Sequence, residues 1–270
     1  MGTAAEVGDS AIPAALRDAL TELGGAEHVL VALDFDGTLA PEVDTPDEAR
    51  ALPASAAALR ALEALPRTSV ALVSGRSLES LERVAEAPAS VLLVGSHGVE
   101  LRLGDADRHP PLSGEEEATA VRLEQTLRDV ADGFDGAWVE RKPAGYALHT
   151  RLSSADDARA AQELARIRVE AAFRGLTPRV GKNVLEFAVR SATKGDGIAA
   201  LREFTGATAV LYAGDDVTDE DGFRALGAGD VGIKVGEGET AAAFRVTGPE
   251  AMAEVLRLLA ESRARLVLPR

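Results

Sequence analysis

His28-Val-Leu-Val-Ala-Leu-Asp-Phe-Asp-Gly-Thr38 joins a short apolar run to a polar turn, and this junction predicts the kind of sheet that the chain forms. The run 28–33 is continuous and rich in valine and leucine, which is typical of a strand buried on both faces. Two carboxylates follow it, Asp34 and Asp36, and Gly37 lets the chain turn sharply.

Strands and helices alternate outward from this junction. Further strands are predicted over 68–73, 91–94, 207–213 and 231–235. Helices are predicted over about 46–65 and 78–87, from about 194, and over 219–226 and 249–262. This alternation indicates an α/β fold with a parallel, doubly wound sheet.

The pattern changes after Leu103. Residues 104–114 are polar and contain prolines, which indicates a hinge. A helix, two strands, a helix and two strands are predicted beyond it, over about 115–131, 137–141, 146–151, 155–173, 177–180 and 183–189. We therefore predict an inserted α+β domain, 105–189, between two parts of a core, 27–104 and 190–270. Residues 1–26 form an N-terminal segment whose start is predicted to be disordered.

Composition restricts the possible functions. The chain of 270 residues has no cysteine, which excludes disulfides and thiolate metal sites, and its net charge of −15 disfavours nucleic-acid binding. No apolar run approaches the length of about 20 residues that a membrane helix needs, and the first ten residues do not resemble a signal peptide. We expect a cytoplasmic, monomeric protein without a nucleic-acid or membrane partner. Only four lysines occur, Lys142, Lys182, Lys194 and Lys234, so each is a candidate for a site that needs a compact ammonium.

Asp34 and Asp36 stand where ligands bind in parallel sheets, beyond the carboxyl end of a strand. One carboxylate can attack a substrate and bind metal, while the other gives and takes a proton. A plain Asp-Gly turn is the alternative interpretation. A calcium loop is disfavoured, because Thr45 stands where the last acidic ligand would be.

Gly214-Asp-Asp-Val-Thr-Asp-Glu-Asp221 is a second acidic segment after an apolar strand. Its carboxylates repel one another unless a cation or a helix N-terminus absorbs their charge. Helix capping explains Glu220 and Asp221, but not Asp215, which precedes any helical turn. Mg²⁺ prefers a few carboxylates together with water and phosphate oxygens, and this arrangement fits it.

Two further segments could hold an anion. Ser74-Gly75-Arg76 ends a strand with a hydroxyl and backbone amides that suit a phosphoryl oxygen. Lys194-Gly195 opens a helix, so that its ammonium could face the same anion. Common turns and surface lysines are the alternative readings of these segments.

Taken together, these segments resemble the haloacid-dehalogenase-like phosphatases at all four motifs of that superfamily, and within it the trehalose-phosphatases. The segments that carry the resemblance are Leu33–Pro41, Ser74–Arg76, Gly95–Gly98, Ala192–Gly195 and Gly214–Asp221. It covers about Val29 to Leu259. The resemblance implies a Rossmann-like core with an inserted cap, and Mg²⁺-dependent hydrolysis of trehalose 6-phosphate to trehalose and phosphate through an aspartyl-phosphate.

The resemblance also implies a role for each core residue. Asp34 would be the nucleophile and a Mg²⁺ ligand, and Asp36 would act as acid and then base while its backbone carbonyl binds the metal. Asp215 would be the third ligand, with Asp216 or Asp219 acting through water. The phosphoryl oxygens would be held by Ser74, Gly75 and Lys194.

The cap would select the sugar. Candidate substrate-binding residues are Arg76, His97, Glu140, Lys142, His149, Arg151, Arg179, Lys182 and Glu186. For the cap members the alternative is an ordinary solvated sheet face, and for His97 a structural histidine. Many relatives have Arg-Pro soon after the glutamate that matches Glu186, whereas Ala188-Val189-Arg190 stand here. Arg190 could replace that arginine from a shifted position.

Two alternatives remain open. A phosphatase for sucrose phosphate, mannosyl-phosphoglycerate or a similar sugar phosphate would share all the core residues. A receiver domain that is phosphorylated without turnover also combines aspartates, a hydroxyl and a lysine, but its acidic pair comes first in a chain about half as long.

Overall fold

The computed structural model describes residues 12–43, 45–104, 106–108, 112–176, 178–181, 183–190 and 192–267. The chain divides into two compact units, Met1–Arg108 with Thr193–Arg270, and His109–Ala192. We call them the core and the cap. The divisions lie a few residues after the predicted ones at 104/105 and 189/190, and the predicted disordered start lies outside the described residues.

The core is built on an eight-stranded sheet in the order β12-β11-β10-β1-β2-β3-β4-β5. Six strands are parallel: β1 (Val29–Leu33), β2 (Thr68–Val73), β3 (Leu92–Gly95), β10 (Ala209–Gly214), β11 (Val231–Val235) and β12 (Phe244–Val246). Two antiparallel strands, β4 (Glu100–Leu103) and β5 (Ala106–Arg108), continue one edge. The predicted parallel α/β sheet is confirmed.

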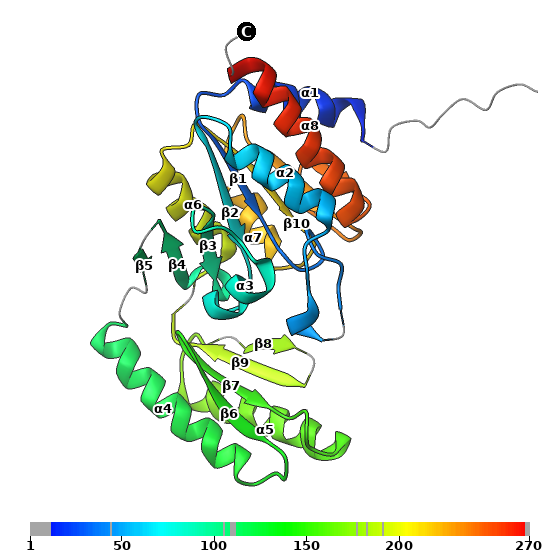
Figure 1. Cartoon of the computed structure of the whole chain (residues 1–270). Coiled ribbons are helices and arrows are strands. Elements are labelled where there is room, and N and C mark those ends of the chain that lie inside the picture. The colour runs from blue at the N-terminus through cyan, green and yellow to red at the C-terminus, as the bar shows by residue number, and fades with distance from the viewer. Residues whose placement is uncertain are drawn as a thin grey trace, which may run out of the picture. The chain divides into compact units, whose positions relative to one another are not determined.

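Helices cover both faces of this sheet, which Figure 1 shows around β1 and β10. One face carries α1 (Ala14–Gly24), α2 (Pro53–Glu63), α3 (Leu78–Ala85) and α8 (Pro249–Val267). The other carries α6 (Lys194–Thr205) and α7 (Asp219–Arg224). Alternate side chains of β1 serve the two layers: Val31 and Leu33 pack in the first, Leu30 and Ala32 in the second. This two-sided burial is the reason that β1 reads as an unbroken apolar run.

Two predictions about the core elements were wrong in detail, and several core elements were missed. The helix expected over 46–65 is a short 3-10 turn, η1 (Pro46–Glu48), followed by α2. The break lies before Pro53, because a proline disfavours helical geometry in the residue before it, and Leu52 has ψ 140°. The expected hinge at 104–114 begins within the β4–β5 hairpin. Helix α1 and the strands β4, β5 and β12 were not predicted.

Arg263 of α8 is a wholly buried guanidinium at the end of the sheet away from the acidic turns. It donates to the carbonyl oxygens of Gly24 (3.0 Å) and Ala26 (2.8 Å), which precede β1. It also donates to the carbonyl of Arg67 and the hydroxyl of Thr68, at the start of β2. The last helix is thereby tied to the segments that lead into two central strands.

The cap packs two helices on one face of an antiparallel sheet. Its elements are α4 (Gly114–Ala131), α5 (Ala155–Ala172), β6 (Trp138–Lys142), β7 (Gly145–His149), β8 (Pro178–Gly181) and β9 (Val184–Ala188), with strand order β6-β7-β9-β8. Leu123 and Leu127 of α4 meet Leu148, Leu185 and Phe187 of the sheet in its core. The opposite face carries polar side chains, among them Glu140 and Glu186. In the strand register these two residues flank Ala147 of β7, Glu140 on β6 and Glu186 on β9.

Candidate active site

Three neighbouring strands end together at one edge of the core sheet. Asp34 follows β1, Ser74 follows β2, and Asp215 follows β10. The sheet ladder extends into the turns, because Asp34 N donates to Ala213 O at 2.9 Å and Ser74 N donates to Val94 O at 2.8 Å. Residues far apart in the sequence therefore converge where a parallel sheet binds ligands.

Lys194 lies between two buried carboxylates. Its Nζ is 3.1 Å from Asp34 Oδ2 and 2.7 Å from Asp219 Oδ1. Asp34 is 5% exposed, Lys194 2% and Asp219 0%. The other oxygen of Asp34 accepts the backbone N–H of Phe35 at 2.7 Å, and Tyr212 donates its hydroxyl to Asp219. The arrangement shields a nucleophile candidate from bulk water while leaving one cation beside it.

Burial and crowding of like charges shift the pKa values of these groups. Burial raises the pKa of Asp34 well above its ordinary value, and Asp219 and Asp215 add to the rise while Lys194 opposes it. Burial is also the main reason that the pKa of Asp215 rises to about 6. For Lys194 burial favours the neutral amine, but Asp34 and Asp219 outweigh it and raise the pKa. The cluster thus has an excess of negative charge that a further cation would relieve.

The donor set fits Mg²⁺. Oxygens of Asp34, Asp215 and Asp219 lie within 4.8 Å of one another. Hard carboxylate oxygens suit Mg²⁺, and a group without histidine or cysteine ligands disfavours Zn²⁺. Asp219, one of the two residues expected to act through water, lies inside this cluster and accepts hydrogen bonds from Lys194 and Tyr212. Tyr212 was missed because its hydroxyl is hidden in an otherwise apolar strand.

Two glycines allow the acidic segments to meet. A Cβ on Gly37, whose φ is +72°, would lie 2.1 Å from Asp215 Oδ2. A Cβ on Gly214 would lie 2.1 Å from Asp219 Cγ. Thr38 Oγ1 donates to Asp215 Oδ1 at 3.1 Å and so joins the two segments directly. Any larger residue at either glycine would push the carboxylates apart.

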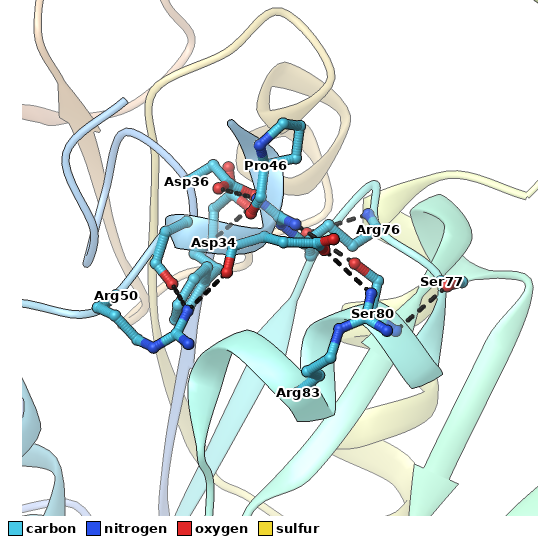
Figure 2. A network of polar contacts seen from close by, with 12 residues as sticks. Asp34, Asp36, Pro46, Arg50, Arg76, Ser77, Ser80 and Arg83 are labelled. Atoms are coloured by element: carbon cyan, nitrogen blue, oxygen red, sulfur yellow. Dashed lines mark hydrogen bonds and ion pairs between the residues drawn. The ribbon is translucent and has the colours of Figure 1, made fainter. Parts of the chain in front are cut away.

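Asp36 is held by Arg76 in a two-pronged ion pair (Figure 2). Arg76 Nε donates to Asp36 Oδ2 at 2.6 Å, and Nη2 donates to Oδ1 at 2.7 Å. The same guanidinium donates to Pro46 O at 2.8 Å and to Ser80 Oγ at 3.3 Å. The hydrogen bond to Asp36 raises the pKa of Arg76. Arg76, predicted to bind substrate, is thus engaged within the core with the acid–base candidate.

Ser74 and Gly75 turn the chain at the end of β2, and His97, which follows β3, lies against this turn. Ser74 Oγ accepts the N–H of Arg76 at 3.1 Å, and Ser74 O accepts the N–H of His97 at 3.0 Å. A Cβ on Gly75 would lie 2.6 Å from His97 Cε1, so only glycine lets the ring approach this closely. His97 therefore packs on the predicted phosphate-binding turn.

In the cap, three predicted substrate residues form one chain of contacts. Glu140 accepts from Lys142 Nζ at 2.7 Å and bonds His149 Nε2 at 2.6 Å. Trp138 stacks on His149, with ring centroids 4.7 Å apart and planes 7° from parallel. Burial of the Glu140 carboxylate acts to raise its pKa. The hydrogen bonds from Lys142 and His149 outweigh burial and lower the pKa of Glu140.

The other cap candidates are spread along the same sheet. Glu186 of β9 lies opposite Arg179 of β8 in the register of the two strands. Arg179 Nη2 donates to Ala192 O at 3.0 Å. Arg151 is exposed just after β7. Lys182 lies outside the described residues. Arg190, considered as a substitute for the family arginine, forms a two-pronged ion pair with Glu116 of α4, at 2.9 and 2.7 Å.

A family model described as trehalose-phosphatase matches residues 32–250. The chain belongs to the trehalose-phosphatase family. A curated trehalose-phosphate phosphatase of Mycobacterium marinum is 35% identical to it, over 93% of this chain and 67% of that protein. The chain thus spans about two thirds of the length of the curated relatives that it matches first. The predicted resemblance is confirmed.

Solved structures agree with this trehalose-phosphatase assignment. The trehalose-6-phosphate phosphatase of Aspergillus fumigatus is 26% identical, with a TM-score of 0.68 over 94% of this chain and 100% of that one. The C-terminal domain of the Candida albicans enzyme, at 21% identity, shares the fold with a TM-score of 0.73, over 91% of this chain and 97% of that one. The family consists of phosphoric monoester hydrolases, and the fold is of the predicted haloacid-dehalogenase-like type. Among the helices that the structure describes, none has the length and apolar character needed to cross a membrane.

Proposed function

We propose that this member of the trehalose-phosphatase family hydrolyses trehalose 6-phosphate to trehalose and phosphate at Asp34. The observation that carries the proposal is the burial of Asp34 against Lys194, 3.1 Å away, at the carboxyl end of β1 with Asp215 and Asp219 close by. A carboxylate in this position can act as a nucleophile, since a neighbouring cation offsets the charge of the incoming phosphate.

In the first step the Asp34 carboxylate attacks phosphorus, and the bond from phosphorus to the sugar oxygen breaks. Asp36 supplies the proton that the departing sugar oxygen needs, because an alkoxide is a poor leaving group. Lys194 Nζ and Ser74 Oγ hold phosphoryl oxygens, and the nearly complete burial of both side chains strengthens these contacts. The products are trehalose and an aspartyl-phosphate.

In the second step Asp36, now a carboxylate, takes a proton from water as the water attacks phosphorus. The acyl–phosphate bond breaks, Asp34 is restored and phosphate leaves. In the structure both Asp36 oxygens accept hydrogen bonds from Arg76. At least one of these bonds therefore opens during turnover so that an oxygen can carry the proton.

Mg²⁺ completes the proposal. Asp34 and Asp215 would hold it with their carboxylates and Asp36 with its backbone carbonyl. When bound, Mg²⁺ supplies positive charge that offsets the carboxylates and the phosphoryl group. The oxygen-only cluster and the raised pKa of Asp215 support this assignment.

The polar face of the cap sheet would choose the sugar. Glu140, Lys142 and His149 offer both donors and acceptors within one connected group, as hydroxyl recognition requires. Glu186 and Lys182 are assigned to the same task by the sequence. Phosphatases for other sugar phosphates share the core residues, so the substrate depends on this face.

A phosphate-release screen tests the substrate. Purified protein with Mg²⁺ is offered trehalose 6-phosphate, sucrose 6-phosphate, mannosyl-3-phosphoglycerate and glucose 6-phosphate, with Asp34→Asn as the control for contaminating phosphatases. We expect the highest kcat/KM for trehalose 6-phosphate and no release by the variant. A higher value for another sugar phosphate would refute the substrate, and equal release by Asp34→Asn would refute the site.

A further inference from the structure

Lys234 of β11 is a buried lysine that the proposed chemistry does not use. It is 4% exposed and is one of only four lysines in the chain. Its Nζ donates to the backbone carbonyl oxygens of Asp215 at 2.5 Å and Asp216 at 3.4 Å. The carboxylate of Glu220 is farther away, at 3.9 Å. A buried ammonium is costly, and here its shortest contact is with main chain at the metal-site candidate.

The peptide group between Asp215 and Asp216 is held at both ends. Its carbonyl oxygen accepts from Lys234, and its N–H, on Asp216, donates to Asp219 Oδ2 at 2.9 Å. Because a peptide group is planar, fixing both ends sets the orientation of the whole unit. The backbone at Asp215, and with it the direction of the Asp215 side chain, is then restrained.

The Asp215 carboxylate is closely packed and has little room to move. It accepts from Thr38 Oγ1 and lies so close to Gly37 that no Cβ would fit there. One oxygen each from Asp34, Asp215 and Asp219 falls within 4.8 Å of the others. A shift of the backbone at Asp215 would move its carboxylate relative to Asp34.

We propose that Lys234 is a positioning residue: it holds the 215–216 peptide so that the carboxylates of Asp215 and Asp34 bind one Mg²⁺ together. The inference rests on the proposed function for the role of Mg²⁺. Lys234 acts through Asp215, much as partners of metal ligands do elsewhere, whose loss typically weakens metal binding by about 10- to 100-fold.

A purely electrostatic role for Lys234 predicts the opposite sign. If the ammonium only balanced the charge of the acidic loop, its removal would leave more net negative charge around the site. A cation would then bind more tightly. If Lys234 orients the peptide, its removal weakens Mg²⁺ binding despite the gain in negative charge. The direction of the change separates the two roles.

The test compares Lys234→Met with Arg224→Met. Arg224 lines the same cavity as Lys234 and Asp215, and its guanidinium pairs with Asp221 at 3.3 Å. Both variants lose one positive charge near the acidic loop. Mg²⁺ affinity is measured by calorimetry without substrate. We expect about 10- to 100-fold weaker binding for Lys234→Met, and unchanged or tighter binding for Arg224→Met. Unchanged or tighter binding for Lys234→Met would overturn the proposal.

Folding and turnover are read separately. Thermal unfolding in EDTA reports whether each variant folds, and Lys234→Gln, which keeps an uncharged donor, replaces Lys234→Met if the latter does not. Lys234→Gln is also expected to bind Mg²⁺ more weakly, and normal affinity would count against the proposal. With p-nitrophenyl phosphate, high Mg²⁺ should restore most of kcat in the Lys234 variant, whereas a low kcat at every Mg²⁺ concentration would indicate a different role.

Mg²⁺ binding and trehalose 6-phosphate hydrolysis by the unmodified protein distinguish failure of this proposal from failure of the proposed function. Mg²⁺ binding without hydrolysis of trehalose 6-phosphate would refute the substrate and leave the role of Lys234 open to the same comparison of variants. Absence of Mg²⁺ binding by the unmodified protein would refute the metal site and the role of Lys234 with it.

Discussion

Lys194 meets two buried carboxylates and keeps its charge because Asp34 and Asp219 together outweigh the cost of burial. Burial, together with the charges of Asp219 and Asp215, disfavours the ionised form of Asp34 and outweighs the opposing effect of Lys194 on its pKa. The site thus holds its nucleophile in an environment that opposes the charge that the reaction needs. Such residues commonly lower stability in favour of function.

We expect Asp34→Asn to abolish turnover and to leave the melting temperature unchanged or higher. The amide is close in size to the carboxylate but is a poor nucleophile. Lys194 retains Asp219 at 2.7 Å, and one of the repelling charges is gone. Phosphate release and thermal unfolding, both measured without metal and then with Mg²⁺, check the two parts. A clear fall in melting temperature without metal would show that the Asp34–Lys194 pair stabilises the fold.

Helix α4 begins with a capping box in which Ser113 and Glu116 bond each other's backbone N–H. Arg190, just after β9, donates twice to the Glu116 carboxylate. Hydrogen bonds from Arg190, followed by the backbone bond from Ser113, lower the pKa of Glu116 to about 2. One carboxylate therefore joins the first turn of α4 to the end of the cap sheet.

This arrangement predicts a pH-dependent contribution to stability. The pKa of Glu116 is lower in the folded state than its ordinary value of 4.5, so its stabilisation is fully present above about 4.5. It is lost as the pH falls from there toward 2. Glu116→Gln should melt at a lower temperature than the unmodified protein at pH 7, and the gap should close between pH 4.5 and 2. A gap of constant size across that range would mean that the charge of Glu116 contributes nothing.

The polar face of the cap sheet predicts a split between substrates. We expect Glu186→Ala to lower kcat/KM for trehalose 6-phosphate by about ten- to a hundredfold, since a polar partner left unpaired in a closed site costs roughly 1–3 kcal/mol. Hydrolysis of p-nitrophenyl phosphate, which has no sugar for the cap residues to bind, should change much less. Parallel steady-state assays with Lys182→Ala as a second variant check this. Equal losses on both substrates would assign Glu186 to the fold or to the core chemistry.

At the scale of the molecule, the described residues include one group of carboxylates that could hold a metal ion, Asp34, Asp215 and Asp219, and the proposed reaction uses such a cation besides Lys194. We expect excess EDTA to abolish activity and added Mg²⁺ to restore it. Ca²⁺ should restore it poorly, because it prefers more ligands at longer distances. Activity assays after dialysis check this expectation. Full activity in excess chelator would contradict the assigned roles of Asp34 and Asp215 in metal binding.

Much of this arrangement could be predicted from the sequence, because buried parallel strands are unbroken apolar runs and the polar residues at their ends are conspicuous. Asp34, Ser74 and Asp215 were identified in this way, and the structure brings them to one edge of the sheet. The contacts of Lys234 and Tyr212 were not predictable. Each is a polar group inside an apolar strand, and its partner is set only when neighbouring elements pack.

Short and local features were missed for related reasons. Strands β4 and β12 have three or four residues, too few for a period to show. The break before α2 depends on the residue that precedes Pro53, within a stretch whose alanines and leucines favour a helix throughout. The ion pair between Asp36 and Arg76 joins residues 40 apart in sequence and needs the fold to form.

The place of β1 in the sheet has a consequence for how the protein is made. β1 lies between β2, which leaves the ribosome soon after it, and β10, which follows only after the whole cap has been synthesised. Until then one edge of an entirely apolar strand is unpaired, and such an edge invites pairing with other chains. Arg263 comes later still, so the Ala26 carbonyl before β1 also lacks its hydrogen bond from Arg263 until then. The nascent chain is therefore exposed to aggregation through the edge of β1 while the cap is being synthesised. Strand β10 and helix α8 end this exposure when they pack, and so they protect the chain against aggregation as well as forming parts of the enzyme.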